Sequence, residues 1–225
     1  MARFLWLLTA FIGLLCIGTG AASLVPEVAK RDDNLPARVP YVFPEPGTDP
    51  IADHIRERRT NGTLLDLDGV LLNAPLIAQA WDQFFGVIRD NNTLPPTMRE
   101  LFILRIAALN NASYEWLQHE SVGRSAGLTT DQLLVIRLAP PFLPGMDVTD
   151  IMGPDLSAAL LYTDWLTKSV HVPDEVFNGL RQFLNDTQMV EATATAGGYN
   201  LVSRFVEALN VDDKMDVAVP VPTST

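Results

Sequence analysis

Cysteine is almost absent from the sequence, whose 225 residues include one, Cys16. It falls in an N-terminal stretch, residues 1–22, that we identify as a secretory signal peptide, with a signal anchor as the alternative. Arg3 precedes an apolar run from Phe4 to Ile17, and a small-residue cleavage site follows. The processed protein would then contain no thiol. Cysteine-based redox catalysis, disulfides and thiolate metal sites are therefore excluded.

Positive charge is also scarce, since 16 Lys and Arg residues stand against 27 Asp and Glu residues, a formal net charge of −11. Nucleic acids and anionic membrane surfaces attract basic faces, so neither is an expected partner. Hydrophobic residues make up 48% of the chain, which argues against disorder. The length suits one domain with a sizeable core.

No convincing β-strand is present, and the predicted fold class is all-α. Helical apolar spacing marks several segments. The predicted helices are 73–89, two within 100–127, 129–138, 156–169, 174–184 and 187–209. In the first, Asn73 is the expected N-cap, and the apolar stripe consists of Leu76, Ile77, Ala80, Phe84 and Val87.

The helical domain is expected to span residues 61–211. Residues 23–31, which end at a dibasic pair, resemble a pro-segment, and residues 32–60 read as an extended Pro-rich arm. Residues 212–225 are expected to be a disordered tail. The four N-x-S/T sequons, at Asn61, Asn91, Asn111 and Asn185, fit a secreted glycoprotein.

The candidate site lies in residues 100–127, which read as two helices separated near Asn110-Asn111. Glu100 falls on the apolar face of the first helix, where a carboxylate is costly unless another group answers it. Glu115 and His119 are four residues apart and therefore share one face of the second helix. Two carboxylates and an imidazole on facing surfaces predict an acid–base site.

The same stretch resembles the carboxymuconolactone decarboxylase/AhpD-like superfamily, an all-α family of decarboxylases and thiol peroxidases. In the peroxidase branch a glutamate is followed by eleven residues, Cys-x-x-Cys, three residues and a histidine. Glu100 and His119 match the outer positions, whereas Ala112 and Glu115 stand at the two cysteine positions. The decarboxylase branch lacks that cysteine pair, and the YEW-x-x-H form here, ending at His119, is similar to decarboxylase-like members.

The resemblance covers roughly residues 72–211 and implies an AhpD-like helical fold that assembles into a homo-oligomer. It also implies decarboxylation of a small cyclic or lactone acid without a cofactor. In this interpretation His119 shuttles the proton, Glu115 orients and polarises His119, and Glu100 completes the relay.

Further residues are candidates for substrate contact, and they are Trp81, Trp116 and Tyr199. A metal site at Glu115 and His119 is not expected, because no further His or Cys stands nearby. No glycine-rich phosphate loop or Ser nucleophile elbow is present, and nothing suggests nicotinamide, flavin or haem.

Two alternatives stay open. The same acid and base could serve dehydration, isomerisation or ring closure, and such a tailoring step in secondary metabolism fits a secretory protein better than central catabolism does. Alternatively, the protein is a non-catalytic secreted relative of AhpD-type peroxidases that lost its cysteines and kept Glu100 and His119 in a structural network.

Overall fold

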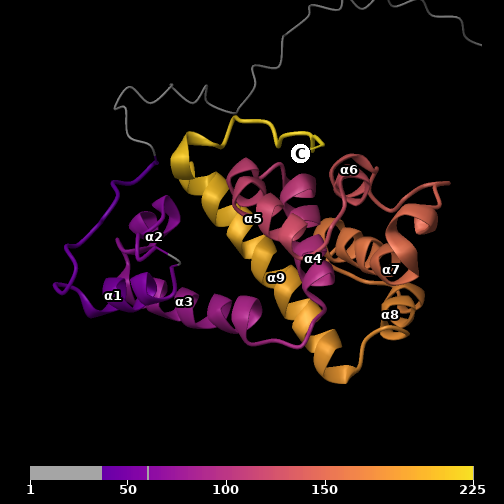
Figure 1. The fold of residues 1–225 in the computed structure, drawn as a ribbon, viewed down its shortest axis with the longest axis horizontal. Coiled ribbons are helices and arrows are strands. Elements are labelled where there is room, and N and C mark those ends of the chain that lie inside the picture. Colours follow the sequence, from indigo (N-terminus) through magenta and orange to yellow (C-terminus); the bar gives the residue numbers. More distant parts are fainter. Residues whose placement is uncertain (1–36, 60, 225) are drawn as a thin grey trace, which may run out of the picture. The chain divides into compact units, whose positions relative to one another are not determined.

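The computed structural model describes residues 37–59 and 61–224; the expected signal peptide, pro-segment and start of the arm, with Cys16, lie outside the described residues. All regular secondary structure in this part is helical, as predicted (Figure 1). None of the described helices is both long and apolar enough to cross a bilayer. The elements are α1 (Pro50–Glu57), α2 (Asp66–Leu71), α3 (Pro75–Asp90), α4 (Pro96–Asn110), α5 (Ser113–Ser125), α6 (Thr130–Leu138), α7 (Thr149–Lys168), α8 (Asp174–Arg181), α9 (Asp186–Leu209) and the 3₁₀ turn η1 (Val211–Asp213).

Helix α4 is surrounded by other helices and packs against α5, α6, α7 and α9 (Figure 1). Every side chain from Leu101 to Ala107 is buried, and only Arg105 interrupts this apolar run. A helix that is apolar on all sides is stable when other elements cover all of them. Consequently Glu100, one residue before the run, also lies inside the protein, 1% exposed.

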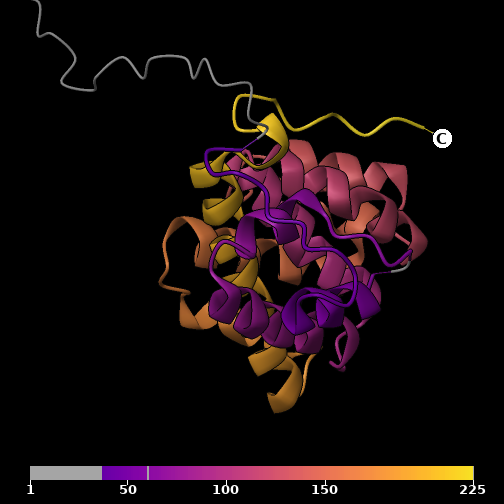
Figure 2. The ribbon, with the colours of Figure 1, turned by 90° about the vertical axis from the view of Figure 1, so that its left-hand side faces the viewer.

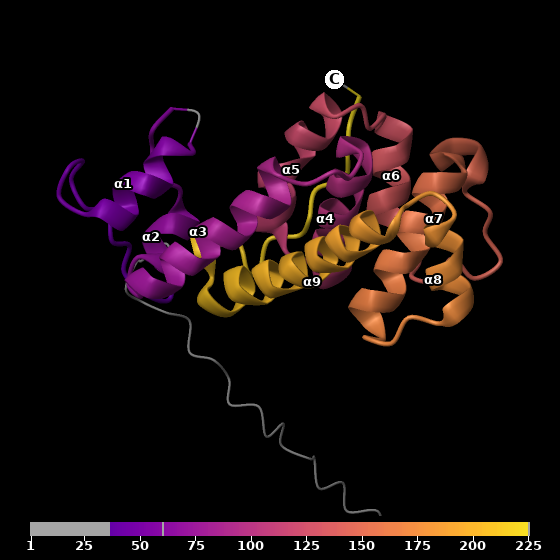
Figure 3. The ribbon, with the colours of Figure 1, turned by 90° about the horizontal axis from the view of Figure 1, so that it is seen from below.

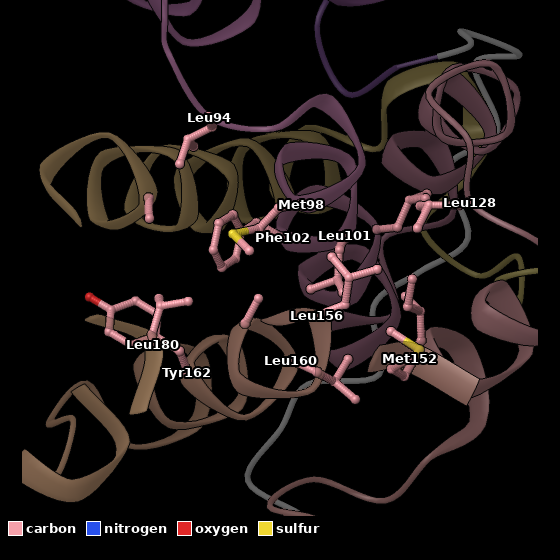
Figure 4. Packing of buried hydrophobic residues seen from close by; sticks show 14 of the residues in the cluster. Leu94, Met98, Leu101, Phe102, Leu128, Met152, Leu156, Leu160, Tyr162 and Leu180 are labelled. Atoms are coloured by element: carbon pink, nitrogen blue, oxygen red, sulfur yellow. The ribbon is translucent and has the colours of Figure 1, made fainter. Parts of the chain in front are cut away.

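Two hydrophobic clusters form the core. In the first, Met98 and Phe102 of α4 meet Leu156, Leu160 and Tyr162 of α7 (Figure 4). The second joins α1, α2 and α3 to α9 and to the inner ends of α4 and α5. The candidate site lies beside this second cluster.

Arg105 of α4 and Asp164 of α7 form a fully buried ion pair. Nε and one terminal nitrogen of Arg105 bond the two carboxylate oxygens at 2.6 and 3.0 Å. The remaining nitrogen donates to the carbonyls of Ile136 and Ala139, at 2.8 and 2.9 Å. The pair therefore holds the end of α6 against α7.

Helix α3 buries a different face from the one that its apolar stripe marks. The stripe residues Leu76, Ile77, Ala80, Phe84 and Val87 are all exposed, Leu76 to 77%. The helix instead buries Ala78, Phe85 and Ile88. Close packing against α9 requires a glycine there, because a Cβ at Gly198 would lie 3.0 Å from the Phe84 ring. Two faces of α3 therefore carry apolar side chains, and the rest of this chain buries only one of them.

The start of α3 also differs from the expectation. Asn73 does not cap the helix; α3 begins at Pro75, and its N-cap residue Ala74 makes no side-chain bond. The Asn73 amide donates instead to the Pro40 carbonyl, at 2.8 Å. This bond attaches the N-terminal segment to the domain. Helix α6, by contrast, starts where predicted, with a capping box between Thr129 and Gln132, and Gly127 before it adopts the left-handed conformation.

The Pro-rich arm has no regular secondary structure over residues 37–49, with a turn at 46–48, but Pro50 begins helix α1 (Figure 2). Proline is tolerated in a first helical turn, and the Asp49 carboxylate accepts two backbone N–H bonds there. The arm packs on its own domain, since the Arg38 N–H donates to the Leu209 carbonyl at 2.7 Å.

Residues 214–224, which follow η1, pack on the domain and do not form the expected disordered tail. Arg137 donates two hydrogen bonds to the Val219 carbonyl, at 3.1 and 2.8 Å, and the Val219 side chain is buried. Arg124 donates to the Thr223 carbonyl at 3.0 Å. Apolar valines let the tail pack on the domain, a contact that composition alone does not reveal.

Candidate functional site

The turn between α4 and α5 brings the candidate residues together. Asn111 adopts the left-handed conformation that ends α4, with φ of 56°, as the predicted break requires. The helices then approach closely, because a Cβ at Gly123 would lie 2.9 Å from the Leu104 side chain. This close contact lets a side chain of α5 reach Glu100.

Glu100, His119 and Tyr199 form a hydrogen-bonded chain across three helices. Nδ1 of His119 lies 2.9 Å from Oε2 of Glu100, and a carboxylate only accepts, so Nδ1 carries the hydrogen. Nε2 of the same ring lies 3.3 Å from the Tyr199 hydroxyl. The Tyr199 ring also meets the imidazole edge-on, with centroids 5.1 Å apart. The imidazole is thus oriented at both nitrogens.

Glu115 makes no hydrogen bond to His119 among the described residues, whereas the sequence-based interpretation has Glu115 orienting that ring. Its Oε2 accepts a hydrogen bond of 2.7 Å from Ser203, and its Oε1 is buried without a partner among the described residues. Burial raises the pKa of Glu115 well above its usual range, and the nearby charge of Glu207 adds to this. Residues four apart share a face, yet their side chains need not point toward each other.

A cavity of about 610 Å³ opens onto these groups. Its wall includes Glu100, Glu115, His119 and Tyr199 and the apolar side chains of α3. The further lining residues are Arg58, Arg59, Asn61, Thr63, Leu65, Leu67, Trp81, Phe85, Arg89, Asp90, Arg99, Tyr114, Gln118, Val122 and Val202.

The three aromatic candidates divide in the structure. Trp81 and Tyr199 line the cavity and stay candidates for substrate contact. Trp116 does not: it is fully buried in the first cluster, and its indole N–H donates to Glu120 at 2.8 Å. A large apolar side chain one position from Glu115 points away from it, because neighbouring residues on a helix face different directions.

Arginines give the cavity a cationic wall that sequence analysis missed. Arg58 is paired with Asp82 and Asp90, and Arg59 with Asp68. The positive charges of two other arginines, Arg99 and Arg89, are less neutralised. Nε of Arg99 lies 3.2 Å from Glu100. Arg89 has no acidic partner among the described residues.

The Arg89 guanidinium is held by neutral groups. Its Nε donates to the Phe85 carbonyl at 3.1 Å, and its central carbon lies 5.7 Å from the Phe85 ring centroid. Burial raises the pKa of the Tyr199 hydroxyl, and the charges of Arg89 and Arg99 act on it in the opposite direction. A cation without a carboxylate, beside an open cavity, is suited to an anionic ligand. Sequence offers no signal for it, because Arg89 reads as a last-turn residue of α3.

No set of three His, Cys, Asp or Glu side chains that could hold a metal ion is found among residues 37–59 and 61–224. Glu115 and His119 in particular bond to different partners.

Comparison with known proteins shows the fold and matches part of the chain to a family. Residues 75–143, which include the Glu100–Glu115–His119 set, match the Carboxymuconolactone decarboxylase family. An uncharacterised peroxidase-related protein from Ralstonia eutropha, described as an alkylhydroperoxidase AhpD core, has a TM-score of 0.62 and 19% identity, over 83% of this chain and 98% of that one. No curated protein is significantly similar.

Two further structures agree in fold. An uncharacterised peroxidase-related protein from a Silicibacter species has a TM-score of 0.57 and 16% identity, over 76% of this chain and 91% of that one. A protein of unknown function from Agrobacterium tumefaciens, described in relation to the antioxidant defence protein AhpD, has a TM-score of 0.53 and 19% identity, over 62% and 91%. The class is therefore an AhpD-like helical protein. The match of residues 75–143 to the carboxymuconolactone decarboxylase family and the AhpD-like fold support the superfamily that the spacing of Glu100 and His119 predicts.

Proposed function

We propose that this protein is an acid–base lyase that decarboxylates a small cyclic or lactone acid. The observation that carries the proposal is the chain Glu100–His119–Tyr199 in the wall of a cavity that also presents Arg89. A volume of about 610 Å³ is in the range of small-molecule sites.

The arginine side of the cavity would bind a carboxylate that remains on the substrate, with Arg89 as the principal contact. A second carboxylate would then face the apolar side chains of Trp81 and Phe85. Apolar surroundings disfavour a carboxylate relative to neutral CO₂, so they favour loss of that group.

In the chemical step the bond between carbon and the leaving carboxylate breaks, and its electron pair passes to a conjugated carbonyl, giving an enolate and CO₂. His119 gives a proton from Nε2 to the carbon and regains one from solvent. Glu100 holds the Nδ1–H and stabilises the imidazolium form that gives the proton; the ring is neutral until solvent returns one. The Tyr199 hydroxyl positions the ring.

The test is incubation of the purified protein with carboxymuconolactone, the lactone acid that gives the family its name, in D₂O. Release of CO₂ with one deuterium incorporated at the decarboxylated carbon would support the proposal. Deuterium incorporation without CO₂ would overturn decarboxylation in favour of isomerisation. No reaction with this acid or with other lactone and β-keto acids would overturn the catalytic proposal.

A further inference from the structure

The unpartnered oxygen of Glu115 is the starting point. The side chain is 1% exposed and lines the cavity, one carboxyl oxygen accepts from Ser203, and the other, Oε1, meets no partner in the described part of the chain. Buried polar atoms nearly always have a hydrogen-bond partner. Since Glu115 is part of the cavity wall, a bound ligand is the natural source of that partner.

The protonation state of Glu115 decides whether Oε1 donates or accepts a hydrogen bond. The side chains that act on it are Ser203 and Glu207, both from α9: the Ser203 hydroxyl favours the anion, whereas the Glu207 charge disfavours it. The position in the first turn of α5 favours an anion only weakly. Burial outweighs these effects and raises the pKa of Glu115. Of the charged groups on the other walls, Arg99 bonds to Glu100, and Glu100 also bonds to His119.

A neutral carboxyl has one acceptor oxygen and one O–H donor. Because Oε2 accepts from Ser203, the hydrogen belongs on Oε1, the oxygen without a partner among the described residues. An O–H donor there seeks an oxygen acceptor on the ligand.

We propose that Glu115 binds the substrate as a neutral acid, its Oε1–H donating to a ketone, lactone or enolate oxygen of a small acid whose carboxylate lies at Arg89. The ligand class is therefore an oxo acid or lactone acid, with a carboxylate and a carbonyl oxygen held at separate points. The inference rests on the proposed function for the reaction, in which this donor would stabilise the enolate oxygen as CO₂ leaves. Glu115 does not polarise His119.

Binding of two matched probes tests the assignment without turnover. Levulinate and pentanoate have the same number of carbons and one carboxylate each, and only levulinate has a ketone. We expect calorimetry at neutral pH to show levulinate binding about tenfold more tightly, equivalent to about 1.4 kcal/mol. Glu115→Gln keeps a neutral N–H donor and should retain this preference, whereas Glu115→Leu should lose it.

Glu175→Gln, on the exposed start of α8, is the matched control and should bind both probes as the unaltered protein does. A merely structural Glu115 would lower the melting temperature in Glu115→Leu but leave the ratio of the two affinities unchanged. That result would overturn the proposal, and so would Glu115→Gln losing the preference as fully as Glu115→Leu, because an ionised carboxylate would then be the functional form.

Two further measurements separate this inference from the decarboxylase proposal. The infrared difference between the unaltered protein and Glu115→Gln should contain the C=O band of a protonated carboxyl; carboxylate bands there would overturn it. As pH rises through the raised pKa, the preference for levulinate should disappear, and Glu115→Gln should keep it. Failure to release CO₂ from any acid changes neither result.

Discussion

Nδ1 of His119 lies 2.9 Å from Oε2 of Glu100, across the contact between α5 and α4. The other ring nitrogen faces the Tyr199 hydroxyl. The imidazole is 12% exposed and Glu100 2%, so the pair is shielded but remains at the cavity wall. A histidine fixed at both nitrogens can exchange a proton on one side while the other stays bound, which is the arrangement that proton transfer to a ligand needs.

His119→Ala should remove the proton transfer while the fold survives. General acid–base groups contribute about 10²–10⁴-fold in rate, so we expect a loss of that order in turnover per folded molecule. His171→Ala, in the exposed loop before α8, is the matched control. Turnover by correctly folded His119→Ala at the unaltered rate would remove His119 from the mechanism.

Arg89→Met should weaken the binding of carboxylate substrates. Hydrogen bonds to charged groups contribute about 1.5–3 kcal/mol, so KM should rise by roughly 10- to 150-fold, with a smaller effect on kcat. Arg89→Lys keeps the charge and should recover part of the affinity. Arg181→Met, at an exposed ion pair, serves as control. An unchanged KM in Arg89→Met would show that the anion binds elsewhere.

Arg105→Met should destabilise the protein without altering the site. Removing one partner of a buried ion pair costs about 3–5 kcal/mol, because the other charge stays buried and unpaired. Replacing both partners, Arg105→Met with Asp164→Leu, should recover much of the unfolding free energy measured in urea. If Arg105→Met unfolds at the same urea concentration as the unaltered protein, the pair does not stabilise the fold in this way.

The sequence predicts the helices well where residues with strong helix start or stop preferences mark their ends. Thr129 with Gln132 marks a helix start, Gly127 marks a helix end, and Asn111 marks a break, since each does so by a local backbone or capping preference. Pro50 was misread because proline disfavours helix interiors but suits a first turn.

The sequence predicts which residues form the site but not which groups they hydrogen-bond to. Spacing on one helix places Glu115 and His119 on a common face, but their partners Ser203, Glu100 and Tyr199 come from other helices. Such long-range pairings depend on how helices pack, which local periodicity does not encode. The same holds for Arg89.

We expect the exposed stripe of α3 to be covered by a second copy of this chain, which fits the sequence-based expectation of a homo-oligomer. The stripe residues are Leu76, Ile77, Ala80, Phe84 and Val87. Helix α9 runs beside α3 (Figure 3) and adds exposed Val190 and Leu201. No exposed residue from 75 to 87 is charged. With a net charge of −11, two copies repel one another, so an uncharged apolar face is the favourable surface for contact.

Light scattering on the purified protein tests this expectation. The unaltered protein should have the mass of an oligomer, and Phe84→Glu should have that of a monomer, because a charge would be buried at the contact. Val170→Glu, at a residue 85% exposed in a loop, should leave the mass unchanged. A monomeric unaltered protein at micromolar concentration would contradict the prediction.

Stability should fall as pH rises from about 4.5 to about 7, because of Glu207. Burial raises the pKa of Glu207 from 4.5 to about 7, and the charge of Asp216 adds to the effect. In this window the folded protein holds a proton that the unfolded chain has released, so a rise in pH favours unfolding. Glu207→Gln removes this proton and should lose less stability across the window in urea unfolding. Part of the remaining slope belongs to Glu115, whose pKa is also raised. Glu175→Gln, at an exposed carboxylate, should follow the unaltered protein. Parallel pH curves for Glu207→Gln and the unaltered protein would show that Glu207 titrates alike in both states.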